Sequence, residues 1–179
     1  VAFGLFDWMD RGNAPLQQLY EEHLQLLEAA DAAGFFGYHL AEHHATPLGM
    51  APSPALFLSA AAQRTRHIRL GPLVYLLPLY HPLRLIEEVC MLDHLSNGRL
   101  ELGVGRGVSP YELGYFGVNA AETRAMFSEA LAVLLAGWPV TVPATTVNRL
   151  CGSSLDAVMT ASRLVETGDA EIAVAAGVE

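Results

Sequence analysis

The stretch IRLGPLVYLLPLYHPLRLIEEVCMLDHLSNGRLELGVGRG, residues 68–107, contains an apolar run, a helical pattern and a second apolar run. The first run, residues 68–77, predicts a strand. Pro82 opens a helix whose apolar residues recur at three- and four-residue steps, and the asparagine-glycine pair after it predicts its end. Residues 99–104 predict the next strand. Because parallel strands need a crossover of a dozen or more residues, the stretch predicts a strand–helix–strand unit of a parallel sheet.

The same alternation runs through the rest of the first 137 residues. Strand patterns occupy residues 1–6 and 36–40, and helical patterns occupy residues 13–34, 53–63 and 119–137. Four successive strand-plus-helix units with apolar strands predict an α/β fold, with helices packed on a parallel sheet. After residue 137 the composition changes, and the patterns there predict a helix over 151–167 and a last strand over 171–178.

Composition excludes several classes of function. The 179 residues carry 10 basic and 19 acidic side chains, a formal net charge of −9, and every basic residue is an arginine. Without lysine the chain cannot form a lysine Schiff base or complete a P-loop, and without a basic patch we expect no nucleic-acid partner. The longest apolar run is too short to span a bilayer, so we expect no membrane partner. Two distant cysteines and no basic-then-apolar leader favour a cytoplasmic location.

Glu42-His43-His44 is the first candidate site. The run follows the strand over 36–40, and ligands in parallel α/β folds bind at the carboxyl ends of the strands. Adjacent histidines there can act as a general base, move protons or bind a metal. The alternative is that they only hydrogen-bond the backbone of a loop. A metal site completed by His39 is disfavoured because no third ligand has a suitable spacing, so we expect no metal.

The run GVGRG, residues 103–107, is the second candidate site. Its glycines would let backbone amides approach an anion, and Arg106 offers a two-pronged contact for phosphate. The run fails the dinucleotide-binding fingerprint, which would need glycine at Val108, and a tight turn after a strand explains it equally well. Arg124, one turn into a helix, is on its own explained as a surface charge.

Several short runs occur in a fixed order along the first 137 residues: FGLF at 3–6, AEHH at 41–44, HP at 81–82, SNGR at 96–99, GRG at 105–107 and FG at 116–117. With these runs, residues 1–137 resemble the N-terminal half of the bacterial luciferase-like monooxygenases, which are flavin- or deazaflavin-dependent TIM-barrel enzymes. A TIM barrel has eight strand-plus-helix units. The resemblance therefore implies a half barrel of four units.

By this resemblance His43 is the catalytic histidine beside the flavin ring. The resemblance also implies a set of cofactor-binding positions: Glu42, His44, Leu73, Val74, Gly105, Arg106 and Arg124. In this set the two arginines hold the flavin phosphate, and Leu73-Val74 is the place of a non-prolyl cis peptide. The implied cofactor is reduced FMN or the deazaflavin coenzyme F420, and the implied substrate is an aldehyde-like or other apolar small molecule, oxidised with O2.

The tail carries different runs: TVNRLCGSS at 146–154, DAV at 156–158, GDA at 168–170 and AGVE at 176–179. With these, residues 138–179 resemble the nucleophile segment of the thiolases, which implies that Cys151 is acylated by a coenzyme A thioester. A cysteine at a helix N-terminus has its thiolate favoured by the helix dipole. The structural alternative is a small buried cysteine. The histidine and second cysteine of a complete thiolase site are absent from the tail.

Together these observations predict a luciferase-like half barrel, residues 1–137, joined to a thiolase-like β-α-β fragment, residues 138–179. Three functions follow: a flavin monooxygenase whose half barrel pairs with another copy, a thiolase-type acyltransferase confined to the tail, and a catalytically inactive fusion. An open four-stranded sheet exposes edges and a face that are normally buried. We therefore expect a homo-oligomer.

Overall fold

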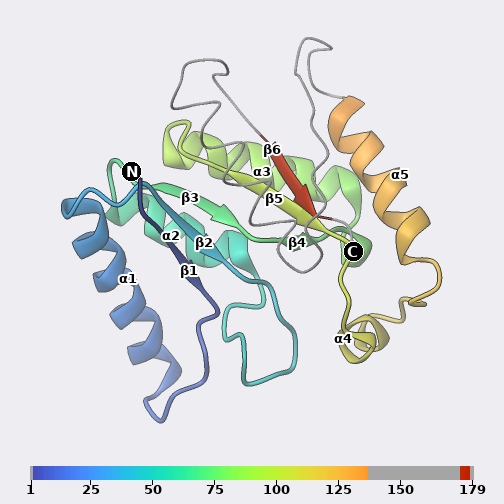
Figure 1. The fold of residues 1–179 in the computed structure, drawn as a ribbon, viewed down its shortest axis with the longest axis horizontal. Helices are drawn as coiled ribbons and strands as arrows, with labels where there is room; N and C mark the ends of the chain where they lie inside the picture. The colour runs from blue at the N-terminus through green and yellow to red at the C-terminus, as the bar shows by residue number, and fades with distance from the viewer. Residues whose placement is uncertain (1, 137–173, 178–179) are drawn as a thin grey trace. The chain divides into compact units, whose positions relative to one another are not determined.

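The computed structural model describes residues 2–136 and 174–177, in which strands and helices alternate as the sequence predicts (Figure 1). The chain divides into two compact units. The first unit comprises Val1–Leu73 and Val89–Glu101, and the second comprises Val74–Glu88 and Leu102–Glu179. The boundary between the units crosses helix α3 (Pro82–Ser96).

The first unit is built on a parallel sheet of β1 (Gly4–Asp7), β2 (Gly37–Leu40) and β3 (Arg69–Pro72), in that order. The connections are α1 (Leu16–Ala32) and α2 (Pro54–Arg64). Tyr38 and Leu40 of β2 are fully buried in a core that both helices share. Because successive side chains on a strand point to opposite faces, His39 lies on the other face of the sheet.

The core of the first unit consists of apolar side chains from β2, β3, α1, α2 and the end of α3. Its fully buried members include Met9, Leu27, Tyr38, Leu40, Leu58, Ile68 and Leu70. Each such side chain contributes roughly 1.5 to 3 kcal/mol when it leaves water. This core fixes the helices on one face of the sheet and leaves the carboxyl ends of β1 and β2 for other contacts.

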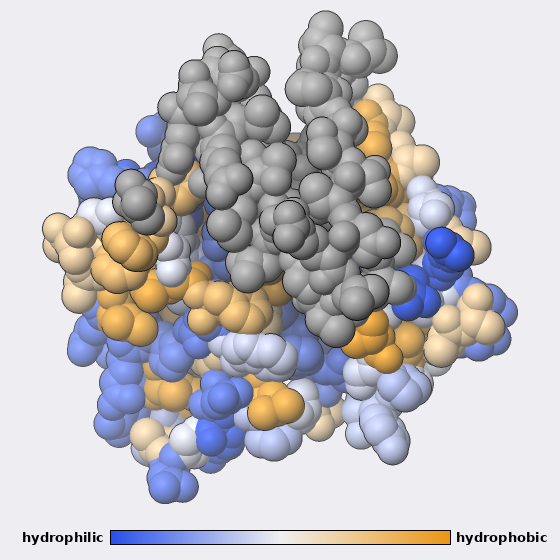
Figure 2. Space-filling view, in the orientation of Figure 1, coloured by the Kyte–Doolittle hydropathy of each residue, from blue (hydrophilic) through white to orange (hydrophobic). Residues whose placement is uncertain are grey.

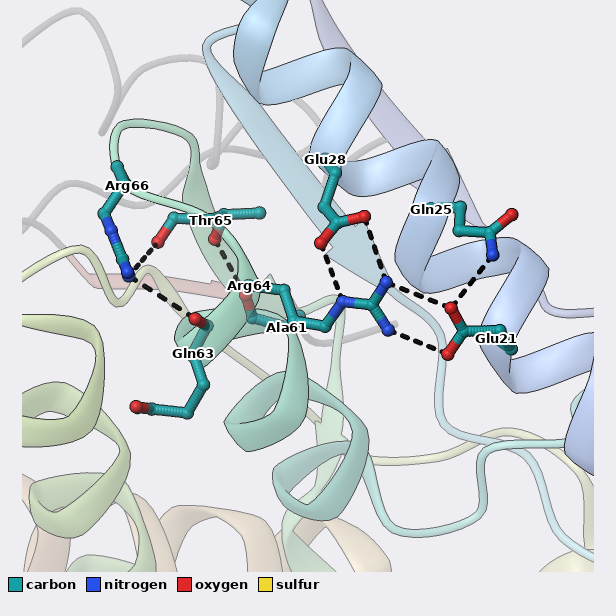
Figure 3. A network of polar contacts seen from close by, with 8 residues as sticks. All are labelled: Glu21, Gln25, Glu28, Ala61, Gln63, Arg64, Thr65 and Arg66. Carbon is teal, nitrogen blue, oxygen red and sulfur yellow. Dashed lines mark hydrogen bonds and ion pairs between the residues drawn. The ribbon is translucent and has the colours of Figure 1, made fainter.

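Arg64 joins the exposed sides of α1 and α2 (Figure 3). Its Nε donates to Glu28 Oε1 at 2.8 Å, and its Nη1 donates to Glu21 Oε2 at 2.7 Å. The guanidinium holds the pKa of both carboxyl groups below their ordinary values. The three charges therefore fix the pairing of the two helices at the surface.

The run SNGR, residues 96–99, forms the corner after α3. Asn97 and Gly98 have positive φ angles of 58° and 75°, which end the helix and reverse the chain. The Arg99 guanidinium then donates to Thr65 Oγ1 at 2.9 Å and to the carbonyl oxygen of Ile68 at 2.8 Å. This run therefore has a structural role, since it ties the corner to the end of α2 and the start of β3.

The second unit contains a parallel sheet of β4 (Tyr75–Leu76), β5 (Leu102–Gly105) and β6 (Val174–Gly177). A short 3₁₀ helix, η1 (Leu77–Leu79), follows β4. α4 (Pro110–Tyr115) and α5 (Thr123–Ala136) follow β5, and α5 packs against η1. The buried face of α5 consists of Thr123, Phe127, Ala130 and Leu134.

The structure confirms the α/β class and corrects several details. The strand predicted over 68–77 is two short strands, β3 and β4, separated at Leu73 and Val74. The sequence analysis missed α4. The helix predicted from Asn119 begins at Thr123, because the Asn119 side chain accepts from the N–H of Ala121 within the preceding turn. The last strand, predicted over 171–178, is β6.

The outer surface mixes hydrophilic and hydrophobic residues, and apolar surface is visible along α5 (Figure 2). Large exposed apolar side chains in the first unit include Phe3, Phe6 and Trp8, at and beyond β1. None of the helices within the described residues combines the length and the apolar character that a membrane crossing needs.

Candidate active site

Glu42, His43 and His44 lie in the first unit, directly after β2, as the sequence analysis predicts. The Glu42 side chain is completely buried, and its Oε1 lies 2.7 Å from His44 Nε2. The two side chains therefore form a hydrogen-bonded pair in which the imidazole and the carboxyl group contact each other directly. This contact holds Glu42 and His44 together on the two sides of His43 in the sequence.

The His43 ring stacks on the indole of Trp8. The two ring centroids are 4.9 Å apart and the rings are inclined by 12°. Trp8 in turn meets Phe6 edge to face, with centroids 5.8 Å apart. On another side, the buried Gly49 packs so closely that a Cβ added to it would lie 2.6 Å from His43 Cβ. His43 is half-buried between these neighbours.

A buried polar cluster on the same sheet involves His39, Arg69 and Glu101. His39 Nε2 lies 2.8 Å from Glu101 Oε2, and Arg69 Nε donates to Glu101 Oε1 at 2.7 Å. His39 thus pairs with a carboxylate from the last residue of the first unit, Glu101. No group of three or more metal-ligating side chains is present among residues 2–136. In the sequence, polar residues that interrupt apolar strand patterns are the feature from which this cluster could have been predicted.

Asp7, at the carboxyl end of β1, is the centre of a second polar cluster. Its Oδ2 accepts from the Tyr38 hydroxyl at 2.6 Å and lies 2.6 Å from His23 Nδ1. Burial alone would raise the pKa of Asp7, but the hydrogen bonds from His23, Tyr38 and the N–H of Met9 lower it overall. The Asp7 carboxylate raises the pKa of His23. The strand-end rule that identified Glu42 also applies to Asp7 and Trp8, which the sequence analysis missed.

Gly105 and Arg106 lie in the second unit, where β5 ends. Gly107 has a φ of 77°, a left-handed conformation that suits glycine and turns the loop after Arg106. The Arg106 guanidinium donates through Nη1 to Thr123 Oγ1 at 3.4 Å, while its buried Nε has no hydrogen-bond acceptor among the described residues. A buried donor without an acceptor is costly, so this nitrogen is a natural place for a ligand oxygen.

The remaining predicted positions are placed as follows. Arg124 is exposed in the first turn of α5, one residue after the hydroxyl that contacts Arg106. Leu73 and Val74 link β3 to β4, and the N–H of Leu73 donates to the carbonyl oxygen of Leu40 at 2.8 Å. Their place beside a cofactor stays a prediction. Cys151 lies outside the described residues.

The chain resembles proteins of one family over most of its length. An uncharacterised protein of Sinorhizobium fredii is 56% identical over 135 residues, which cover 75% of this chain and 40% of that protein. The crystal structure of the monooxygenase RslO1 from Streptomyces bottropensis superposes with a TM-score of 0.74 at 35% identity, covering 84% of this chain and 47% of RslO1. This chain spans less than half the length of either protein.

A second solved structure has a bound cofactor. It is the oxygenating constituent of 3,6-diketocamphane monooxygenase from Pseudomonas putida, a type II Baeyer–Villiger monooxygenase in complex with FMN. It superposes with a TM-score of 0.70 at 27% identity, covering 74% of this chain and 38% of that protein. The two superpositions confirm the TIM-barrel-like α/β fold of the luciferase-like part.

The family model described as luciferase-like monooxygenase matches residues 1–167. This match extends past the boundary predicted at residue 137 and includes Cys151. The comparisons thus add no support for the boundary or for the thiolase-like assignment, which stay proposals. The motifs, the fold and the family match agree for residues 1–136, and the chain belongs to the luciferase-like monooxygenase family.

Proposed function

We propose that this chain is part of a flavin-dependent monooxygenase that oxidises a small apolar carbonyl compound. The observation that carries the proposal is the buried, unpaired Nε of Arg106 in a glycine-rich loop after β5. Family membership and the FMN complex of the Pseudomonas putida relative support it. In such a reaction one atom of O2 enters the substrate, the other leaves as water, and the reduced flavin is oxidised.

The residues around Arg106 fit a phosphate group. A phosphate oxygen would supply the acceptor that Arg106 Nε lacks, and the hydroxyl of Thr123 adds a further polar atom. Arg124, the next residue, brings a second positive charge on an exposed side chain. Both arginines are assigned to the phosphate of FMN. Gly105, buried at the end of β5, is assigned to the same cofactor site.

His43 is the proposed catalytic base. Reduced flavin, when bound, supplies the electrons that activate O2, so the protein needs to hold the reactants, exclude water and move protons. The His43 imidazole is half-buried and stacked on Trp8, and an imidazole is a side chain that can serve as a general base. Glu42 and His44 form a separate hydrogen-bonded pair beside it, assigned to the cofactor site.

The aromatic surface beside His43 favours an apolar substrate. Phe6 and Trp8 are 47% and 42% exposed, so flat hydrophobic area is available next to the proposed base. Aromatic side chains of this kind bind apolar groups through large contact area with few polar requirements. An aldehyde or a ketone combines an apolar body with the carbonyl group that a peroxide-type oxidation attacks, and we assign this class.

Residues 138–179 carry a separate proposal. The runs around Cys151 resemble a thiolase nucleophile segment, and on that basis Cys151 accepts an acyl group from a coenzyme A thioester. This acyltransferase activity is secondary to the monooxygenase proposal because only the tail sequence supports it. The homo-oligomer, expected from the open sheet of the half barrel, is likewise a proposal.

The test uses the full chain with reduced FMN, O2 and a panel of long-chain aldehydes and cyclic ketones. We expect substrate-dependent oxidation, detected as an acid, ester or lactone by mass spectrometry with ¹⁸O from labelled O2 in the product. FMN binding is measured in parallel by quenching of flavin fluorescence, with coenzyme F420 as the alternative cofactor. A chain that binds neither cofactor and forms no labelled product would contradict the proposal.

A further inference from the structure

Two loops of the first unit enclose His43, and each supplies one of its close neighbours. Residues 7–11 carry Trp8, and residues 47–50 carry Gly49. The N–H of Met50 donates to the carbonyl oxygen of Met9 at 2.9 Å. The N–H of Arg11 donates to the carbonyl oxygen of Pro47 at 2.7 Å. The two neighbours of His43 are therefore connected to each other through backbone hydrogen bonds.

The segment that carries Trp8 is itself held in place. Asp7 Oδ1 accepts from the N–H of Met9 at 2.7 Å, across the residue that bears the indole. Met9 has a φ of 51°, a left-handed backbone conformation that few non-glycine residues adopt. Its side chain is fully buried, and this burial holds the turn in place. The Phe6 ring meets the edge of the indole. These contacts leave Trp8 little freedom although 42% of its surface is exposed.

We propose that Trp8 is a positioning residue that fixes the plane of the His43 imidazole for proton transfer. This inference rests on the function proposed above for His43. The χ2 torsion of histidine has a broad distribution, so the ring plane must be fixed by its neighbours. Gly49 limits where the Cβ of His43 lies, and the indole, stacked at 4.9 Å and 12°, restricts rotation of the imidazole about χ2. Trp8 itself exchanges no proton.

An exposed tryptophan with a purely packing role would behave differently. Its truncation would remove the ring-current shielding of His43 and change stability slightly, but it would leave the turnover number unchanged. A positioning role instead links the indole to the geometry of a group that acts in the reaction, where a misplacement of about 1 Å can cost on the order of 100-fold in rate. The ring environment and the turnover number should therefore change together.

The first measurement is made without cofactor. Protein labelled at its seven histidines is compared by NMR with Trp8→Leu, and the His43 signals are assigned from their loss in His43→Gln. The ring current of the indole shields the stacked imidazole, so we expect the His43 ring protons to shift downfield in Trp8→Leu. Trp8→Phe should retain part of the shielding. Phe3→Leu, at an exposed aromatic residue that precedes β1, should leave the His43 signals unchanged.

The second measurement is turnover at saturating flavin and substrate. Trp8→Leu should lower kcat about 10-fold to 100-fold with unchanged FMN affinity, and Trp8→Phe should recover most of the loss. Unmoved His43 signals in Trp8→Leu would overturn the inference whatever the activity. Moved signals with an unchanged kcat would overturn the positioning role alone. A wild-type chain without turnover would overturn the proposed function and the positioning role with it.

Discussion

Asp7 and His23 form an ion pair between the end of β1 and the middle of α1, with 2.6 Å between Oδ2 and Nδ1. Both side chains are mostly buried, at 17% and 20% exposed. The pair raises the pKa of His23 above its ordinary value of 6.5, and hydrogen bonding to Asp7 outweighs the effect of burial, so that the pKa of Asp7 falls below 3.8. The stability of the first unit therefore depends on pH in a definite direction.

The raised pKa of His23 stabilises the fold fully below about pH 6.5, and this contribution disappears as pH rises through the folded-state pKa. The lowered pKa of Asp7 stabilises the fold above about pH 3.8, and this contribution disappears as pH falls.

We expect His23→Gln to lose about 1.5 to 3 kcal/mol of unfolding free energy at pH 5.5 and clearly less at pH 9. Urea denaturation at both pH values checks this. The exposed His94→Gln variant is the control, and an equal loss at both values would contradict the assignment.

Gly49→Ala should displace His43. The new methyl group would lie 2.6 Å from His43 Cβ, so one of the two must move. We expect a loss of about 1 to 3 kcal/mol in stability and a lower kcat with little change in FMN affinity. Thermal unfolding and steady-state kinetics measure the two effects. Gly12→Ala is the matched control, because nothing lies within 4 Å of its added Cβ.

Arg106→Ala should weaken FMN binding about 10-fold to 100-fold, since a charge-assisted hydrogen bond to phosphate is lost. Riboflavin, which has no phosphate, should bind the variant and the wild type equally. Fluorescence titrations with both flavins measure the difference. Arg84→Ala removes an arginine that is 71% exposed and should leave both affinities unchanged. If riboflavin and FMN bind the wild type with equal affinity, Arg106 does not contact the phosphate.

His43→Gln should lower kcat about 100-fold or more and leave the FMN dissociation constant unchanged, because a general base acts in the reaction and contributes little to cofactor binding. Turnover is measured at saturating flavin, with His94→Gln again as control. A variant that retains the wild-type rate would remove His43 from the reaction.

Cys151 should be acylated by a coenzyme A thioester without sustained turnover, because the tail has no histidine to activate the thiol. Cys90 is exposed, so it competes in any labelling experiment. The measurement is therefore made in a Cys90→Ser background by mass spectrometry of the intact chain. Multiple-turnover release of coenzyme A that depends on Cys151 would contradict the expected inactivity.

The sequence predicted the order of strands and helices well because hydrophobic spacing and turn residues are local signals. Local signals of this kind do not identify which face of α3 is buried. Leu83 and Cys90 fit a helical stripe, but the structure buries Leu85 and Leu92 instead, and only the packing of the fold distinguishes the two stripes. Likewise, the run over 68–77 is uniformly apolar, and its division into β3 and β4 depends on which strands it pairs with.

In the candidate site, too, some features follow from local sequence signals and others only from the packing of the fold. The positions of Glu42 and His43 follow from a short motif at a strand end. The stacking of Trp8 on His43 joins residues 35 positions apart, and neither has a motif that specifies the other. Gly49 is visible in the sequence as an ordinary loop glycine, and its close approach to His43 appears only once the two loops are paired.

The backbone hydrogen bonds between residues 7–11 and 47–50 have a practical consequence for enzyme engineering. Because carbonyl and amide groups make these links, they do not depend on side-chain identity at Asp10, Arg11 and Leu48, which are all exposed. A combinatorial library randomised at these three positions would vary the exposed side chains of the two loops that carry Trp8 and Gly49, and it would retain the backbone links between them. Selection from such a library is a direct route to variants with new substrate preferences.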